Sequence, residues 1–198
     1  MATAMRRVGF TLIEVAVATV LVALLAAATI PALNEFMRGR EAISTANTLS
    51  QLALGISNFK AAVMTAGAGT NTYPRLISSL SNPITTSQHN SCSAVFNAGA
   101  VTTWASSGPF VTFNIPPGGL STPLGVVQDS MVRNPNSATV GTLAIRMTID
   151  SVDAVRLDQA VDGGDGPNAG TLRMTFSGAG GAARTADVQY LVPVAAKC

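Results

Sequence analysis

The chain of 198 residues has no charged side chain between Glu14 and Glu35. The 20 residues in this gap, Val15–Asn34, match the length that a helix needs to cross the hydrocarbon core of a bilayer, because each residue adds about 1.5 Å. Arg6 and Arg7 precede the gap, and positive charges favour the cytoplasmic side. The sequence therefore predicts one membrane span, with the N-terminus inside and the remainder of the chain on the far side.

Glu14 lies at the start of this apolar segment and bears on how the segment is interpreted. A secretory signal peptide also has a basic start, an apolar stretch and small residues at a cleavage site, which Ala26–Ala28 would provide. A carboxylate within the apolar segment costs about 2.5 to 3.5 kcal/mol, and neither a signal peptide nor a plain anchor has a reason to carry it. We therefore expect Glu14 to be functional and to have a partner.

The residues around Glu14, Gly9-Phe10-Thr11-Leu12-Ile13-Glu14-Val15, resemble the N-terminal signature of type IV pilins and pseudopilins. The resemblance implies that a prepilin peptidase cleaves between Gly9 and Phe10 and methylates the new N-terminus at Phe10. It also implies that Glu14 pairs with the Phe10 amine of a neighbouring subunit and sets the axial register of a filament, and that Pro31 kinks the helix. The alternative for Glu14 is a side chain that snorkels toward the cytoplasmic headgroups.

Past Pro31 the apolar residues become confined to one face of the helix. The members of this stripe are Leu49, Leu52, Ile56, Phe59 and Val63. Their spacing of three and four residues predicts a helix from about Thr11 to about Met64, whose second half packs on a sheet. Gly39 and Gly55 are expected to be bends or points of close packing.

We expect an α+β fold like that of the type IV pilins, in which a long, half-transmembrane N-terminal helix packs on an antiparallel sheet of about four strands. The predicted parts are a leader peptide (1–9), the transmembrane and polymerisation half of the helix (10–34) and a soluble head (35–198). After a long connection with a short helix at 76–80, the predicted strands are 110–115, 143–149, 171–176 and 187–192. Turns are expected at 116–119, 134–136 and 178–181, and Ser151 is expected to begin and cap a helix through Val161.

Cys92 and Cys198 are the two cysteines of the sequence. Because the predicted head lies on the oxidising side of the membrane, we expect them to form one disulfide. A disulfide in the C-terminal half also resembles the pilin pattern. The alternatives are an intermolecular bond and free thiols.

Asp158, Asp162 and Asp165 form the densest acidic cluster, in a glycine-rich stretch. Oxygen ligands close together on such a loop suit calcium. The spacing lacks the distal glutamate of a full calcium loop, however, and aspartate and glycine are also common in turns. We therefore expect a solvated turn without a metal and keep a calcium site as the alternative.

The other candidates for chemistry have simpler interpretations. His89 is the single histidine, so no zinc cluster can be assembled around it, and we expect it to lie in a solvated loop. Trp104 is expected to cover the core of the head; a surface anchor for a partner is the alternative. The glycine-rich runs lack the lysine of a phosphate-binding loop. We expect neither a cofactor nor enzymatic activity.

Charged residues make up only 11% of the chain, against about 25% in ordinary soluble domains. The net charge is +2 without a basic run, which gives nucleic-acid binding no support. Removing the leader, with Arg6 and Arg7, lowers the basic residues from 12 to 10, equal to the 10 acidic residues. A neutral surface suits copies that pack side by side, because little repulsion accumulates.

The resemblance, together with the apolar segment, implies a structural subunit of a type IV pilus or pilus-like filament, made in the bacterial inner membrane. Its expected partners are other copies of itself, other pilins, the prepilin peptidase and the assembly machinery. The alternatives are a pseudopilin of a type II secretion system and a membrane-tethered periplasmic binding module.

Overall fold

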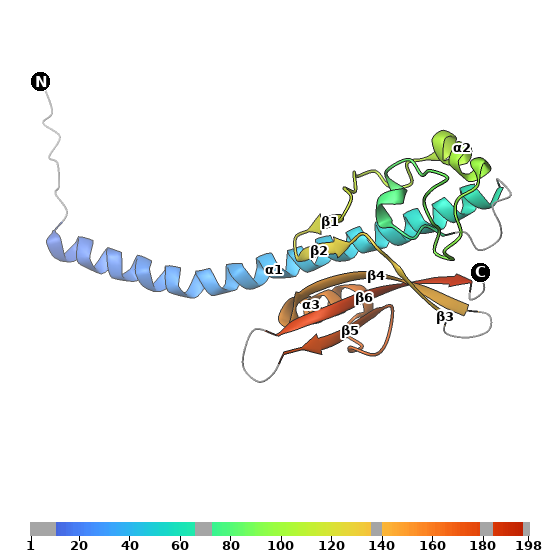
Figure 1. Ribbon diagram of the computed structural model, residues 1–198. Coiled ribbons are helices and arrows are strands. Elements are labelled where there is room, and N and C mark those ends of the chain that lie inside the picture. Colours follow the sequence, from blue (N-terminus) through green and yellow to red (C-terminus); the bar gives the residue numbers. More distant parts are fainter. Residues whose placement is uncertain (1–10, 66–72, 136–139, 179–183, 196–198) are drawn as a thin grey trace, which may run out of the picture. The chain divides into compact units, whose positions relative to one another are not determined.

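The computed structural model describes residues 11–65, 73–135, 140–178 and 184–195 (Figure 1). The chain divides into two compact units, residues 1–40 and 41–198. In chain order its helices and strands are α1 (Leu12–Thr65), the 3₁₀ helix η1 (Ile77–Leu80), α2 (Ala98–Ser107), β1 (Gly119–Thr122), β2 (Gly125–Gln128), β3 (Val132–Pro135), β4 (Val140–Asp150), α3 (Ser151–Asp162), β5 (Leu172–Ser177) and β6 (Thr185–Ala195).

Helix α1 begins at Leu12, directly after a threonine that caps it. The carbonyl oxygen of Thr11 accepts from the N–H groups of Glu14 and Val15, and its Oγ1 lies 3.3 Å from the N–H of Glu14. A threonine at this position satisfies amides that have no partner inside the helix. The helix continues through Pro31 and ends at Thr65, which confirms the predicted span.

In the second unit, residues 41–65 of α1 bury the predicted stripe. The five stripe residues are at most 1% exposed, whereas Leu54, on another face, is 62% exposed. Gly55 is a point of close packing, because a Cβ there would lie 2.6 Å from Cγ1 of Val111. The one-sided apolar pattern thus places one face of the helix in the core.

The sheet has six strands in the order β1-β2-β4-β6-β5, and β3 pairs with β4 as well (Figure 1). All of these pairings are antiparallel. β4 and β6 pair over their full lengths, from Val140 opposite Ala195 to Asp150 opposite Thr185. The fold is therefore α+β, with a long N-terminal helix packed on an antiparallel sheet, and the sheet has two more strands than expected.

Side chains alternate between the two faces of the sheet, as the pleat requires. The apolar face of β4 and β6 joins the core cluster that contains the α1 stripe, and helix α3 adds Ala154 and Leu157 to it. The opposite face carries polar side chains such as Arg146, Asp187 and Gln189. The long antiparallel pair is therefore one wall of the core.

The predicted strand at 110–115 is wrong, since this segment consists of bends and irregular backbone. Its backbone bonds go to the segment around η1: the N–H of Phe110 donates to the Leu80 carbonyl, and the N–H of Ile115 donates to Oγ of Ser81. Val111 and Ile115 are buried nonetheless. The apolar residues that predicted a strand are explained by the burial of their side chains and not by pairing with a neighbouring strand. The other three predicted strands lie within or largely overlap β4, β5 and β6.

Two further local expectations are corrected. The predicted long connection contains α2, whose N-terminal amide at Ala100 donates to Oδ1 of Asn97. Helix α3 is capped by Asp150 and not by Ser151, because Oδ1 of Asp150 accepts from the N–H of Val152 at 2.8 Å. The predicted short helix near η1 is confirmed as a 3₁₀ turn.

The predicted turns have different outcomes. The turn at 116–119 is present, with left-handed backbone at Gly118. The turn at 134–136 is wrong in its first part, because Asn134 and Pro135 belong to β3, and Asn136 lies outside the described residues. Most of the turn at 178–181 also lies outside them.

Candidate functional site

The N-terminal part of α1 exposes an apolar surface within the first unit. Residues 12–38 are all exposed. The large apolar side chains among them are Leu12, Ile13, Val15, Val17, Val20, Leu21, Val22, Leu24, Leu25, Ile30, Leu33, Phe36 and Met37. The most apolar window of this helix has a mean hydropathy of 2.4, and none of it is buried. By length and composition the helix is able to cross a membrane.

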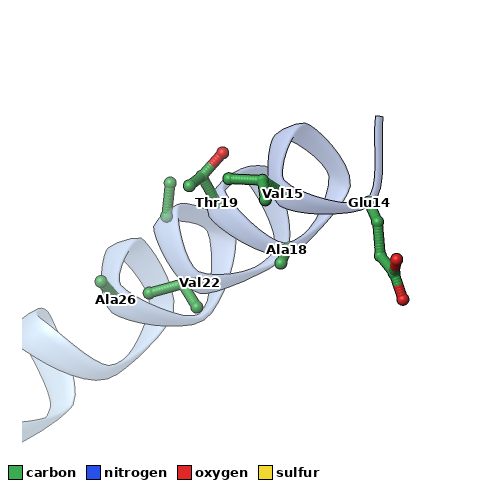
Figure 2. A pocket seen from close by; sticks show the side chains of 7 residues that line it. Glu14, Val15, Ala18, Thr19, Val22 and Ala26 are labelled. Carbon is green, nitrogen blue, oxygen red and sulfur yellow. The ribbon is translucent and has the colours of Figure 1, made fainter. Parts of the chain in front are cut away.

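Glu14 lies in the first turn of this helix, at one end of a shallow face lined by small and apolar side chains. Figure 2 shows its carboxylate extending outward from the helix, whereas Ala18, Val22 and Ala26 follow along the helix. Within the described part of the chain, no side chain pairs with the carboxylate. A negative charge near a helix N-terminus is favoured by the helix dipole.

The two threonines of the apolar segment satisfy their hydroxyl groups inside the helix. Oγ1 of Thr19 donates to the carbonyl of Ala16 at 2.9 Å, and Oγ1 of Thr29 donates to the carbonyl of Leu25 at 3.0 Å. The hydroxyl groups therefore add no unsatisfied donor to a segment that lipid would surround.

Pro31 lies inside the helix and has no N–H, so it cannot bond the carbonyl four residues earlier.

The predicted cleavage site, Gly9 and Phe10, lies outside the described residues. After the apolar segment come Arg38 and Arg40, and the guanidinium of Arg40 lies 5.6 Å from the ring centre of Phe36. The two flanks therefore carry two arginines each, because Arg6 and Arg7 precede the segment. The number of flanking arginines therefore does not favour one orientation of the helix, and the N-terminus-inside topology stays a prediction.

Cys92 lies in the loop before α2 and is disulfide-bonded. Its Sγ lies 3.3 Å from a guanidinium nitrogen of Arg133, on β3. The pairing register carries β6 toward the same end of the sheet, since Arg133 faces Leu143 and Leu143 faces Val192. Cys198 lies outside the described residues, so its pairing with Cys92 stays a prediction.

The three aspartates of the acidic cluster come together at the C-terminal end of α3. Asp158 and Asp162 lie one turn apart on the helix, and Asp165 follows in the loop that begins at Gly163. One carboxylate oxygen from each lies within 4.8 Å of the others. Gly170, which was not among the residues predicted from sequence, lies against this cluster. Its left-handed φ of +66° and its closeness to the carboxylates are visible only in the folded loop.

The remaining candidates occupy the places expected for them. His89 is exposed, in a loop. Trp104 is 6% exposed and belongs to the core cluster, which confirms the expectation that it covers the core.

Comparisons with known proteins give no significant match, whether with a family model, a curated protein or a solved structure.

Proposed function

We propose that this protein is a structural subunit of a type IV pilus or a related filament. The observation that carries the proposal is the exposed apolar part of α1, with a carboxylate in its first turn that pairs with no side chain among the described residues. A helix of this kind serves first as a membrane anchor and then as the surface through which subunits pack. The folded second unit is the part that such a filament would display.

The proposed role of Glu14 follows from the cost of a charge in hydrocarbon. The carboxylate costs about 2.5 to 3.5 kcal/mol in the middle of a membrane span, and less near its end. Cleavage after Gly9 would create a free amine at Phe10, four residues before Glu14. Pairing this amine with the Glu14 carboxylate of a neighbouring subunit would offset the cost in only one axial register. The carboxylate would thereby select the register, while the apolar side chains provide most of the contact area.

A filament subunit also requires a head that tolerates close neighbours. Without the leader, the basic and acidic residues are equal in number, so long-range repulsion between heads is small. The exposed Leu54 and Ile43 of α1 lie on the helix face opposite the buried stripe and add apolar surface to the second unit. Both properties support a role that depends on packing.

Mass spectrometry of filaments sheared from the cell surface tests the proposal. We expect a peptide that begins at N-methylated Phe10. The full-length chain in the membrane, with no such peptide in filaments, would contradict the proposal and favour a membrane-tethered binding module.

A matched pair of variants tests the register role. Glu14→Gln keeps the size of the side chain and removes its charge, and we expect normal insertion and cleavage with a loss of about tenfold or more in the amount recovered in filaments. Glu35→Gln, which removes the charge at the other end of the apolar segment, serves as the control. Equal recovery of Glu14→Gln and the native chain would disprove pairing at Glu14.

A further inference from the structure

The acidic cluster contains a buried carboxylate oxygen without a partner. Asp158 is 3% exposed, and its Oδ2 accepts from the N–H of Gly166 at 3.2 Å. Its Oδ1 is also buried, and no donor reaches it within the described residues. Buried polar atoms are nearly always hydrogen-bonded, because burial without a partner costs free energy. The orphaned oxygen is therefore a buried acceptor that is available to a ligand.

A ligand of this oxygen should be positive, because the surroundings of Asp158 are negative. In the described part of the chain, no lysine or arginine pairs with Asp158, Asp162 or Asp165. Three carboxylates held together without a cation repel one another.

The backbone around the cluster leaves room between the carboxylates. Gly170 has a φ of +66°, and a Cβ at this position would lie 2.5 Å from Oδ2 of both Asp162 and Asp165. Any other residue would fill the space that these two oxygens face. The N–H of Leu172 donates to Oδ2 of Asp162 at 2.6 Å and holds that carboxylate in place.

We propose that Asp158, Asp162 and Asp165 bind one calcium ion at the junction of α3 and the loop that leads to β5. Two oxygens on one ion are separated by at most twice the metal–oxygen distance, which is about 4.6 to 5.2 Å for calcium and about 4.0 to 4.2 Å for magnesium. The three cluster oxygens lie within 4.8 Å of one another, which is compatible with one shared ion, and the choice between calcium and magnesium rests on coordination geometry. Calcium also accepts the irregular geometry of a loop, whereas magnesium requires near-octahedral ligands.

The ion would tie the end of α3 to the loop before β5. Asp158 and Asp162 belong to the helix, and Asp165 belongs to the loop. The end of the helix already contacts β5, because the N–H of Leu172 donates to Asp162. Binding of calcium to the folded state alone would stabilise the second unit in proportion to the logarithm of the calcium concentration. This inference does not depend on filament assembly.

Calcium titration of the full-length chain in detergent micelles tests the proposal. The protein is first stripped with EGTA, calcium chloride is then added, and binding is followed by isothermal titration calorimetry and thermal unfolding. We expect one calcium per chain and a rise of about 5 °C or more in the unfolding temperature at saturating calcium. Magnesium chloride at the same concentration should raise it much less.

Three variants identify the ligands. Asp165→Asn alters an exposed side chain, so it should fold normally, and we expect it to weaken calcium binding about tenfold or more. Asp158→Asn should do the same. Asp153→Asn, on the same helix but paired with Arg156, is the control and should bind as the native chain does.

The proposal would be overturned by an unfolding temperature that does not respond to calcium at millimolar concentrations. An equal response to magnesium would overturn the assignment of calcium. Unchanged affinity in Asp165→Asn would show that any calcium binds elsewhere, and would also overturn the proposal.

Discussion

The indole N–H of Trp104 donates to the backbone carbonyl of Ser79 at 2.8 Å, across 25 residues of sequence. Trp104 lies on α2, Ser79 lies on η1, and both are buried. The ring of Trp104 also meets that of Phe110 edge to face, with centres 6.2 Å apart. This contact joins two segments of the irregular region between α1 and β1, where the described residues have no long strands to supply backbone bonds.

Trp104→Phe should destabilise the second unit by about 1 to 3 kcal/mol, because the Ser79 carbonyl loses its donor and the smaller ring fills less of the core. Hydrogen exchange of the β4 and β6 amides measures the free energy of opening of this unit. Ser106→Ala on the same helix is the control, since its exposed hydroxyl bonds only locally. Equal exchange in Trp104→Phe and the control would contradict the importance of the indole bond.

Gly55→Ala should destabilise the second unit by about 1 to 3 kcal/mol, because the new methyl group would lie 2.6 Å from Val111 and 3.1 Å from the carbonyl oxygen of Phe110. The double variant with Val111→Ala should recover part of this loss. Gly39→Ala is the matched control, since nothing lies within 4 Å of its Cβ position, and it should stabilise the helix by about 0.5 to 1 kcal/mol. Hydrogen exchange distinguishes these outcomes. An unchanged free energy of opening in Gly55→Ala would show that Val111 moves aside at little cost.

Asp150→Ala should cost about 0.5 to 2 kcal/mol, because Asp150 accepts from the first free amide of α3. Ser151→Ala is the informative comparison, since the sequence pattern favoured serine as the cap. We expect it to change stability by less than about 0.5 kcal/mol. Hydrogen exchange of the α3 amides measures the effect of each variant on this helix. A larger effect of Ser151→Ala than of Asp150→Ala would show that Ser151 is the cap.

The buried Asp158 should make the calcium-free protein less stable as the pH rises. Burial raises the pKa of the Asp158 carboxyl in the folded state above its usual value of 3.8, so the folded state holds this proton more tightly than the unfolded chain does. The resulting penalty is absent below about pH 3.8 and develops as the pH rises toward the folded pKa.

Thermal unfolding in EGTA, from about pH 4 to about pH 7, checks this linkage. Other carboxylates titrate in the same range, so the informative quantity is the difference between the native chain and Asp158→Asn. We expect the variant to gain stability relative to the native chain as the pH rises. A difference that does not change with pH would show that Asp158 has the same pKa in both states.

Much of the architecture could be predicted because it depends on local periodicity. The stripe of α1 is buried as its spacing of three and four residues predicted, and the alternating segments within β4 and β6 form strands. The segment 110–115 could not be predicted in this way. Its Val111 and Ile115 side chains are buried, but its backbone bonds to Leu80 and Ser81, which only the folded chain brings beside it.

The same distinction between local sequence pattern and tertiary contact applies to the candidate sites. Sequence alone determined the apolar helix of 20 uncharged residues, the carboxylate at its start and its resemblance to a pilin signature, because solvation and helix periodicity depend on residues close together in the chain. It also located the three aspartates of the acidic cluster. Only the tertiary structure decided that Asp158 is buried with an orphaned oxygen and that Gly170 leaves space beside the carboxylates of Asp162 and Asp165. Burial and hydrogen-bond satisfaction depend on segments that meet in the fold, and no local pattern encodes them.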